Sequence, residues 1–240
     1  MFSFLFGKKN LNRTALLRGM TDVHTHLLPG VDDGFESLDA AGEMLAYLQE
    51  IGIRRLFLTP HVSDEWPANT PAALSVRYEQ LKLIVPDGIE LFLAAEYMLD
   101  AGFRSRMNEG LLVLPGKRVL VETSYLAAPF DFYDLLYDLS LEGYTPIIAH
   151  PERYAYMTEI DYYTLKSKGY KFQLNFFSLC NLYGLAACRK ARDLLEQGLY
   201  DFAGSDCHSV SHYKTGLERL VLTCRQINDL QRLLENNMVL

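Results

Sequence analysis

The sequence predicts an α/β fold in which parallel strands close into a barrel resembling a TIM barrel. From residue 20 onward, short apolar runs of strand length alternate with amphipathic stretches of helix length. Glycines stand where each helix would end before the next strand, as at Gly52, Gly88, Gly143, Gly169 and Gly198. The chain has 240 residues, a length typical of one α/β barrel. We therefore expect a single barrel domain over residues 20–240, preceded by an extension over residues 1–19.

Seven apolar runs are the candidate strands, at residues 20–24, 53–59, 89–95, 119–122, 146–150, 172–175 and 201–204. Between the first two, residues 37–49 carry apolar side chains at spacings of three and four, which form one face of a helix: Leu38, Ala41, Met44, Leu45 and Leu48. Residues 131–141 have the same period. Seven such units fit a closed, mostly parallel barrel better than an open sheet.

Charge and composition exclude several classes of protein. The chain has 23 Lys and Arg against 30 Asp and Glu, a net charge of -7, and 49% hydrophobic residues. These values exclude disorder and argue against nucleic-acid binding. The four cysteines form no CxxC pair, as in proteins whose thiols stay reduced. Because no run reaches the ~18 apolar residues of a spanning helix, we predict a soluble, cytoplasmic protein without stable membrane insertion.

The first residues allow two interpretations. The apolar run of Phe2, Phe4, Leu5 and Phe6 precedes the basic residues, the reverse of the order in a signal peptide. A packed or frayed extension is one interpretation, and a weak anchor to a membrane surface or a partner is the other.

Nine His, Asp and Glu residues stand at or shortly after the ends of predicted strands: His24, His26, Asp33, His61, Glu96, Glu122, His150, Asp206 and His208. A carboxylate that closes an apolar strand is costly to bury unless a cation pairs with it. In a parallel barrel the carboxyl ends of the strands meet on one face. These side chains are therefore expected to converge in one pocket.

The spacing and chemistry of these residues predict a multinuclear metal site. In an extended His-x-His both rings point to the same side, as His24 and His26 would, and Asp206 and His208 repeat the spacing. Nitrogen and oxygen donors suit Mn, Fe or Zn. Clustered carboxylates without metal would repel by ~4 kcal/mol per pair at about 4 Å. Taken singly, each motif also has a purely structural explanation, for example as histidines of the core. His212, which lies past the last predicted strand, can simply be an exposed residue.

Seven segments resemble the polymerase and histidinol phosphatase (PHP) superfamily, and within it the bacterial manganese-dependent tyrosine-protein phosphatases of capsule and exopolysaccharide gene clusters. They are Asp-Val-His-Thr-His at 22–26, Val-Asp-Asp-Gly at 31–34, Thr-Pro-His at 59–61, Ala-Glu at 95–96, Val-Glu at 121–122, Ala-His-Pro-Glu-Arg-Tyr at 149–154 and Gly-Ser-Asp-Cys-His at 204–208. The resemblance covers about residues 20–210 and implies a distorted (β/α)7 PHP barrel.

The resemblance also implies three divalent ions, manganese with iron or zinc as alternatives. The implied ligands are His24, His26, Glu96 and Asp206 for one ion, Glu96, Glu122 and His150 for the second, and Asp33, His61 and His208 for the third. A water shared by two such ions loses a proton near neutral pH, and the resulting hydroxide attacks phosphorus without a protein nucleophile.

Arg153 is the predicted catalytic and phosphate-binding residue, because its guanidinium can grip phosphate oxygens and stabilise charge in the transition state. A salt bridge with Glu152 is the structural alternative. The family usually has a second arginine after the last histidine, and here Lys214 or His212 is expected in its place. Trp66, with Phe35 or Tyr125, is expected to flank an aryl ring.

The function implied by the resemblance is hydrolysis of phosphotyrosine on a bacterial tyrosine autokinase that controls capsular or exopolysaccharide synthesis. Two alternatives remain open: a PHP phosphoesterase acting on a small metabolite such as histidinol phosphate, and a non-catalytic, metal-stabilised binding module. A cysteine-dependent phosphatase is excluded because no cysteine is followed six residues later by arginine. A serine hydrolase is poorly supported, because the chain has no Gly-x-Ser-x-Gly elbow.

Overall fold

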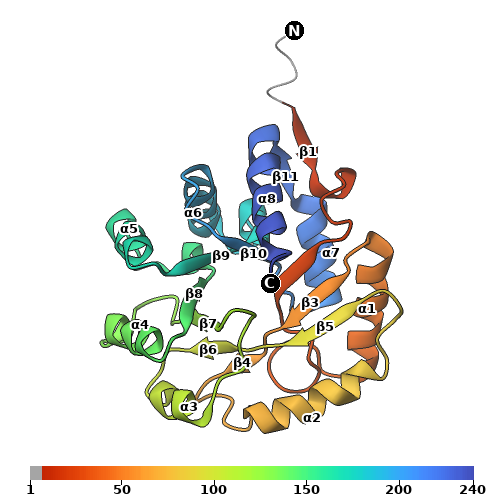
Figure 1. The fold of residues 1–240 in the computed structure, drawn as a ribbon. Coiled ribbons are helices and arrows are strands. Elements are labelled where there is room, and N and C mark those ends of the chain that lie inside the picture. The colour runs from red at the N-terminus through yellow and green to blue at the C-terminus, as the bar shows by residue number, and fades with distance from the viewer. Residues whose placement is uncertain (1–6) are drawn as a thin grey trace.

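Two parallel sheets lie at the centre of the structure, a computed structural model that describes residues 7–240 (Figure 1). The larger sheet has six strands in the order β10 (Phe202–Gly204), β9 (Lys171–Asn175), β8 (Thr145–Ala149), β7 (Arg118–Glu122), β6 (Glu96–Met98) and β4 (His61–Val62). The smaller sheet has the order β2 (Thr21–Thr25), β3 (Arg55–Leu58) and β5 (Glu90–Leu93). Neighbouring strands are parallel throughout both sheets.

The two sheets are connected at two places, at one by the chain itself and at the other by a backbone hydrogen bond. One link lies where β3 leads into β4 and β5 leads into β6, and there the Glu96 amide donates to the Pro60 carbonyl at 3.1 Å. The other joins β2 to the loop after β10, where the Asp206 amide donates to the His24 carbonyl at 2.9 Å. The predicted parallel α/β architecture is confirmed, with its strands divided between two sheets.

Each of the seven predicted strands is present, with ends within two residues of the predicted ones. The sequence did not predict the short strands β4 and β6. It also did not predict β1 (Lys8–Asn10), which pairs in antiparallel fashion with β11 (Val221–Thr223).

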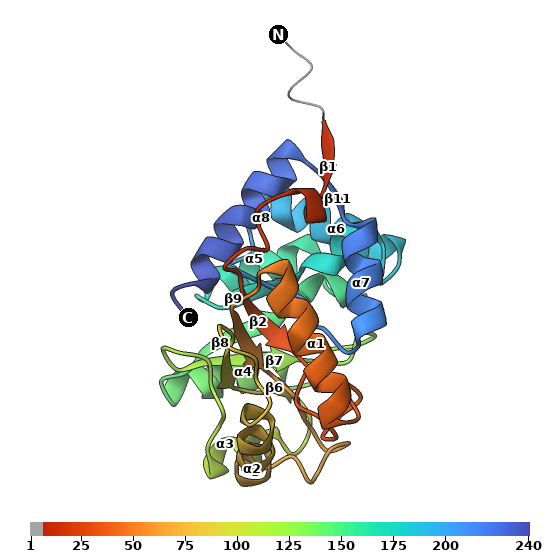
Figure 2. The ribbon, with the colours of Figure 1, turned by 90° about the vertical axis from the view of Figure 1, so that its right-hand side faces the viewer.

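Helices surround the strands on the outside (Figures 1 and 2). The Ser37 side chain caps α1 (Leu38–Ile51) by accepting from the Ala40 amide, and Gly52 ends the helix with a φ of 96°, which a residue without Cβ adopts readily. The buried faces of α1 and of α4 (Phe132–Leu141) are those predicted from the sequence. The remaining helices are α2 (Pro71–Lys82), α3 (Phe103–Glu109), α5 (Glu159–Ser167), α6 (Leu185–Glu196), α7 (Val210–Arg219) and α8 (Cys224–Asn237), with 3-10 turns η1 (Leu11–Arg13), η2 (Pro151–Arg153) and η3 (Phe176–Cys180).

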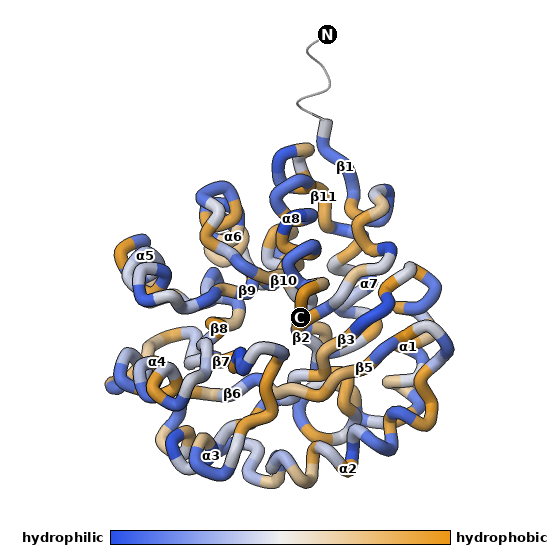
Figure 3. Tube along the Cα trace, in the orientation of Figure 1, coloured by the Kyte–Doolittle hydropathy of each residue, from blue (hydrophilic) through white to orange (hydrophobic). Residues whose placement is uncertain are grey.

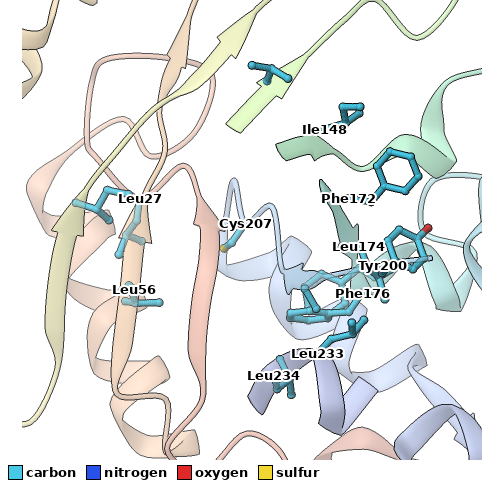
Figure 4. Close-up of a cluster of buried hydrophobic side chains, with 14 of the residues drawn as sticks. Leu27, Leu56, Ile148, Phe172, Leu174, Phe176, Tyr200, Cys207, Leu233 and Leu234 are labelled. Atoms are coloured by element: carbon cyan, nitrogen blue, oxygen red, sulfur yellow. The ribbon is translucent and has the colours of Figure 1, made fainter. Parts of the chain in front are cut away.

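The main hydrophobic core fills the space between the strands and the helices. Figure 4 shows part of it, with Leu56 of β3, Phe172 and Leu174 of β9, and Leu233 and Leu234 of α8. Hydrophobic and hydrophilic residues alternate along most outer helices in Figure 3, as expected of helices that bury one face. A smaller cluster draws side chains from strands of both sheets: Val23, Phe57, Leu120, Ile147 and Phe202. The faces of the two sheets that lack helices therefore pack against one another.

The described part of the N-terminal extension packs on the end of the chain. Beside the β1–β11 pairing, the Leu11 amide donates to the Leu220 carbonyl at 2.9 Å, and Leu11 and Leu17 are buried. The apolar run at residues 2–6 lies outside the described residues. No helix between residues 7 and 240 combines the length and apolar character needed to cross a membrane.

Candidate metal centre

His24 on β2 and His26 just after it turn their rings toward each other. Side chains alternate along a strand, so both rings point to the same side. Their Nε2 atoms are 3.1 Å apart, and both side chains are fully buried. The other ring nitrogens have partners of their own: Nδ1 of His24 lies 2.9 Å from Oε1 of Gln173, and Nδ1 of His26 lies 2.8 Å from Oδ2 of Asp32.

These partners fix the position of the proton in each neutral ring. The amide nitrogen of Gln173 donates to the Leu174 carbonyl at 2.7 Å, so the amide oxygen is the atom that faces His24. Each Nδ1 therefore donates to an oxygen, and each Nε2 is left with a lone pair. This is the arrangement in which supporting oxygens orient imidazole ligands toward a metal.

Two carboxylates complete this first cluster. Oε2 of Glu96 lies 3.2 Å from Nε2 of His24 and 3.3 Å from Nε2 of His26. Oδ1 of Asp206 lies 3.4 and 3.3 Å from the same two atoms. A divalent ion held at about 2.0–2.2 Å by four such donors keeps them about 3.3–3.6 Å apart. The first cluster, His24, His26, Glu96 and Asp206, therefore fits a divalent ion in spacing and in donor chemistry.

Without a cation the first cluster holds protons. Burial by itself lowers the pKa of His24, but the charges of Glu96 and Asp206 outweigh burial and raise this pKa to about 9. Burial also lowers the pKa of His26, but the charge of Asp32 and the hydrogen bonds that the ring donates to Asp206, Asp32 and Glu96 raise it well above its ordinary value. Burial raises the pKa of Asp206, and His24, His26 and further cations hold it well below the ordinary value. Protons and a divalent ion therefore compete for the same Nε2 atoms.

His61, Glu96 and Glu122 form a second cluster. Nδ1 of His61 lies 2.8 Å from Oε1 of Glu122 and 3.3 Å from Oε2 of Glu96. His150, which has a left-handed backbone (φ 32°) between β8 and η2, places Nε2 3.0 Å from Oε1 of Glu96 and 3.9 Å from Oε2 of Glu122. The carboxylate pair is thus flanked by two imidazoles, whereas the resemblance implied only that of His150 here.

His26, Asp33, His61 and His208 form a third cluster, which faces solvent. Oδ1 of Asp33 lies 3.5 Å from Nε2 of His61 and 3.4 Å from Nε2 of His208. The hydrogen bond with His208 lowers the pKa of Asp33 to about 2. The Asp33 side chain is 62% exposed, so this cluster is the part of the centre that is accessible to solvent.

Each pair of clusters shares one residue. Glu96 belongs to the first and second clusters, His61 to the second and third, and His26 to the first and third. The three clusters therefore form one continuous centre. Eight of the nine residues predicted as ligands belong to it, and the ninth, His150, lies against Glu96.

Arg153, the last residue of η2, lies at the mouth of the centre. Its Nη1 donates to Oδ2 of Asp206 at 2.6 Å. The alternative of a salt bridge with Glu152 is wrong, because the buried Glu152 carboxylate accepts hydrogen bonds from the hydroxyls of Ser178 and Tyr200 instead. A cavity of about 470 Å³ opens beside Arg153, lined by Asp33, His61, Tyr125, His150, Arg153, Tyr183, Asp206, His208 and His212.

The other predicted substrate contacts differ in where they lie. His212 lines the same cavity, and burial lowers its pKa, so the ring is neutral near pH 7. Trp66 lines an adjoining cavity that shares Asp33, His61 and Tyr125 with the first. Phe35 is buried in the core.

Lys214 lies outside both cavities. It is two residues beyond His212 on α7, and residues two apart on a helix point to different sides. Its Nζ lies 4.7 Å from the ring centre of Tyr47.

Several supporting residues were missed by the sequence interpretation. Asp32, the neighbour of Asp33, also accepts a hydrogen bond from the His61 amide at 3.0 Å. Asn175 of β9 donates to Oδ2 of Asp206 at 3.1 Å, two positions beyond Gln173. Polar residues at alternate positions of an apolar strand were the available signal for this pair.

A parallel α/β fold whose strand ends gather imidazoles and carboxylates in overlapping clusters defines a metal-dependent α/β enzyme. The profile of the capsular polysaccharide synthesis family CpsB/CapC matches residues 20–229. The chain belongs to this family.

Similar proteins carry tyrosine-phosphatase names. The chain is 33% identical over 202 residues to "Tyrosine-protein phosphatase YwqE" of Bacillus subtilis (strain 168), covering 80% of this chain and 78% of the relative. It is 28% identical over 210 residues to "Putative tyrosine-protein phosphatase CapC" of Staphylococcus aureus, covering 84% and 82%. A solved structure described as "Crystal structures of YwqE from Bacillus subtilis and CpsB from Streptococcus pneumoniae, unique metal-dependent tyrosine phosphatases" matches with a TM-score of 0.72 and 27% identity, covering 90% of this chain and 95% of the other.

Proposed function

We propose that the chain is a metal-dependent protein-tyrosine phosphatase. The observation that carries the proposal is the first cluster, in which two oriented Nε2 atoms and two carboxylate oxygens converge at 3.1–3.4 Å. The names of the relatives and the metal dependence stated for the solved relative support it. As to architecture, we propose a distorted (β/α)7 barrel over residues 20–240, with residues 1–19 as an extension.

Three divalent ions, manganese with iron or zinc as alternatives, are proposed to occupy the three clusters, with His150 as a further ligand beside Glu96 and Glu122. Bound ions of this kind activate water and neutralise the charge of a phosphoryl group. The positive charge of three divalent ions would exceed the negative charge of the four carboxylates, Asp33, Glu96, Glu122 and Asp206. The centre would therefore attract a phosphate dianion even though the protein is acidic overall.

Arg153 is the residue proposed to bind the phosphate and to stabilise charge in the transition state. Asp206 holds its Nη1, while Nε and Nη2 have no hydrogen-bond partner among residues 7–240. That edge of the guanidinium can form two parallel hydrogen bonds to phosphate oxygens. Neutral His212 is proposed as a further donor, and Trp66 as an aromatic wall for the tyrosyl ring.

The proposed substrate is phosphotyrosine on a bacterial tyrosine autokinase that controls capsular or exopolysaccharide synthesis, in the cytoplasm. Membership of a capsular polysaccharide synthesis family supports the pathway, and the tyrosine-phosphatase names of the relatives support the chemistry. Cys180, Cys188 and Cys207 form no disulfide with one another, which is compatible with a reducing compartment.

Elemental analysis of protein purified without added metal, followed by turnover assays, tests this function. We expect bound divalent metal, turnover of a phosphotyrosine peptide that a chelator abolishes, and slower turnover of a phosphoserine peptide and of histidinol phosphate. Equal rates on the three substrates would contradict the tyrosine assignment. Bound metal without turnover of any phosphoester would identify a binding module instead of an enzyme.

A further inference from the structure

The guanidinium of Arg153 lies between two tyrosine rings. Its Cζ is 4.3 Å from the ring centre of Tyr125 and 4.3 Å from the ring centre of Tyr183. The three residues come from separate parts of the chain: Tyr125 follows β7, Arg153 ends η2, and Tyr183 lies between η3 and α6. Only 17% of the Arg153 side chain is exposed, so these contacts are largely shielded from water. An arginine with a ring on each side has its plane fixed by attraction and by packing.

Each ring is itself held by further aromatic residues. Tyr125 stacks on buried Tyr154, with 6.2 Å between ring centres and 26° between ring planes. On the other side, Tyr183 meets the ring of His212 edge to face at 5.6 Å, and His212 in turn meets Phe177 at 6.0 Å. Each tyrosine therefore has an aromatic neighbour besides the guanidinium, Tyr183 at a partly buried position and Tyr125 at a position that is 39% exposed.

We propose that Tyr125 and Tyr183 are positioning residues for Arg153. They hold the guanidinium plane so that Nη1 stays on Asp206 while the opposite edge remains available to a phosphoryl group in the cavity. This inference rests on the proposed function and deepens it. Without the rings, the cation would be free to turn toward other carboxylates of the centre or into solvent, and binding of phosphate would have to reorder it. The ring face of Tyr125 that meets Arg153 is then not available to flank a substrate ring.

Kinetics of four single variants, loaded with Mn²⁺, test the role of the rings on a phosphotyrosine peptide. Tyr125→Leu and Tyr183→Leu should each lower kcat/KM about tenfold, because each removes one cation–π contact. Tyr125→Phe and Tyr183→Phe should restore kcat/KM to within about threefold of the parent, because the contact is made by the ring face. Metal content and thermal unfolding are measured on every variant. Tyr137→Leu, at an exposed position of α4, is the matched control.

A double-variant cycle separates positioning from a general structural effect. If the rings act through Arg153, then Tyr183→Leu added to Arg153→Ala should produce no further fall in kcat/KM. A further tenfold fall in the double variant would overturn the inference, as would Leu variants as active as the parent. Leu variants that lose metal would also overturn it, because their effect would then arise at the metal clusters. Failure of the parent protein to hydrolyse any phosphoester would instead contradict the proposed function.

Discussion

Asp32 shows how one carboxylate can determine the donor geometry of a neighbouring ligand. Its Oδ2 faces Nδ1 of His26 at 2.8 Å and also accepts from the His61 amide, so it orients one ring and one backbone segment. We predict that Asp32→Ala lowers the affinity for Mn²⁺ by about 10–100-fold, the usual effect of losing such a partner. Isothermal titration calorimetry, in which Mn²⁺ is added to the metal-free protein, measures this affinity. Asp193→Asn, an exposed carboxylate on α6, is the control, and equal affinities for parent and Asp32→Ala would contradict the assigned role.

The raised pKa of His24 predicts that metal binding releases protons. In the metal-free protein this pKa is about 9, so His24 is protonated at pH 7.5. A metal needs the Nε2 lone pair, and the proton must leave. We therefore expect release of at least one proton per centre at pH 7.5 and tighter metal binding as the pH rises toward 9. Calorimetry in two buffers of different ionisation enthalpy measures the number of protons released; a value of zero would refute the protonated state.

At the residue scale, the sequence was sufficient to predict which imidazoles and carboxylates converge, but not their supporting contacts. The convergence of His24, Glu96 and Asp206 could be predicted because burying carboxylates at the ends of strands costs free energy unless a cation is shared among them. Asp32 could not be distinguished from Asp33 by type, because only the path of the loop decides which carboxylate faces His26. Lys214 was predicted as a phosphate contact, and the rotation of α7 places its Nζ beside Tyr47, outside the cavity at Arg153.

At the element scale, Glu152 ties η2 to the neighbouring elements. Its buried carboxylate accepts from the Asn175 amide at 3.1 Å, from Ser178 Oγ at 2.8 Å and from the Tyr200 hydroxyl at 2.9 Å. We predict that Glu152→Ala lowers the free energy of unfolding by about 3 kcal/mol, because buried donors lose their acceptor. Urea unfolding of the metal-free protein measures the change. Glu43→Ala, at an exposed position of α1, should change the value by less than about 0.5 kcal/mol.

If Glu152→Ala had the same midpoint of urea unfolding and the same dependence of unfolding free energy on urea as the parent protein, the hydrogen bonds of Glu152 would contribute little to stability. The Glu43→Ala control guards against a general effect of removing one negative charge from an acidic chain.

The period of apolar residues predicted the long strands and the two helices α1 and α4 well, and the short elements poorly. Buried parallel strands are continuous apolar runs, and the helix over residues 38–51 buries the face that its spacing indicated. β4 and β6 contain only two and three residues, and each begins with a ligand-type side chain, so neither forms an apolar run. β4 pairs with β6, and β6 pairs with both β4 and β7, so these short strands depend on tertiary pairing.

For the whole molecule, the centre predicts a strong link between metal and stability. Its carboxylates are gathered in a largely buried space, and ions that bind only the folded chain stabilise it by mass action. At a free Mn²⁺ concentration 100 times the dissociation constant, one site contributes about 2.7 kcal/mol, or a rise in Tm of about 5–10 °C for a chain of this length. Thermal unfolding with EDTA and with added Mn²⁺ measures the shift; an unchanged Tm would contradict a buried, folding-dependent site.

The sharing of Glu96, His61 and His26 between clusters bears on how the protein responds to scarcity of metal. Because Nδ1 of His26 donates to Asp32, this ring keeps one lone pair and can bind one ion only, whereas Glu96 can offer one carboxylate oxygen to each of two ions. Two cations in neighbouring clusters also repel each other. Filling should then proceed in separate steps of falling affinity, and a cell starved of the ion would contain many half-loaded molecules.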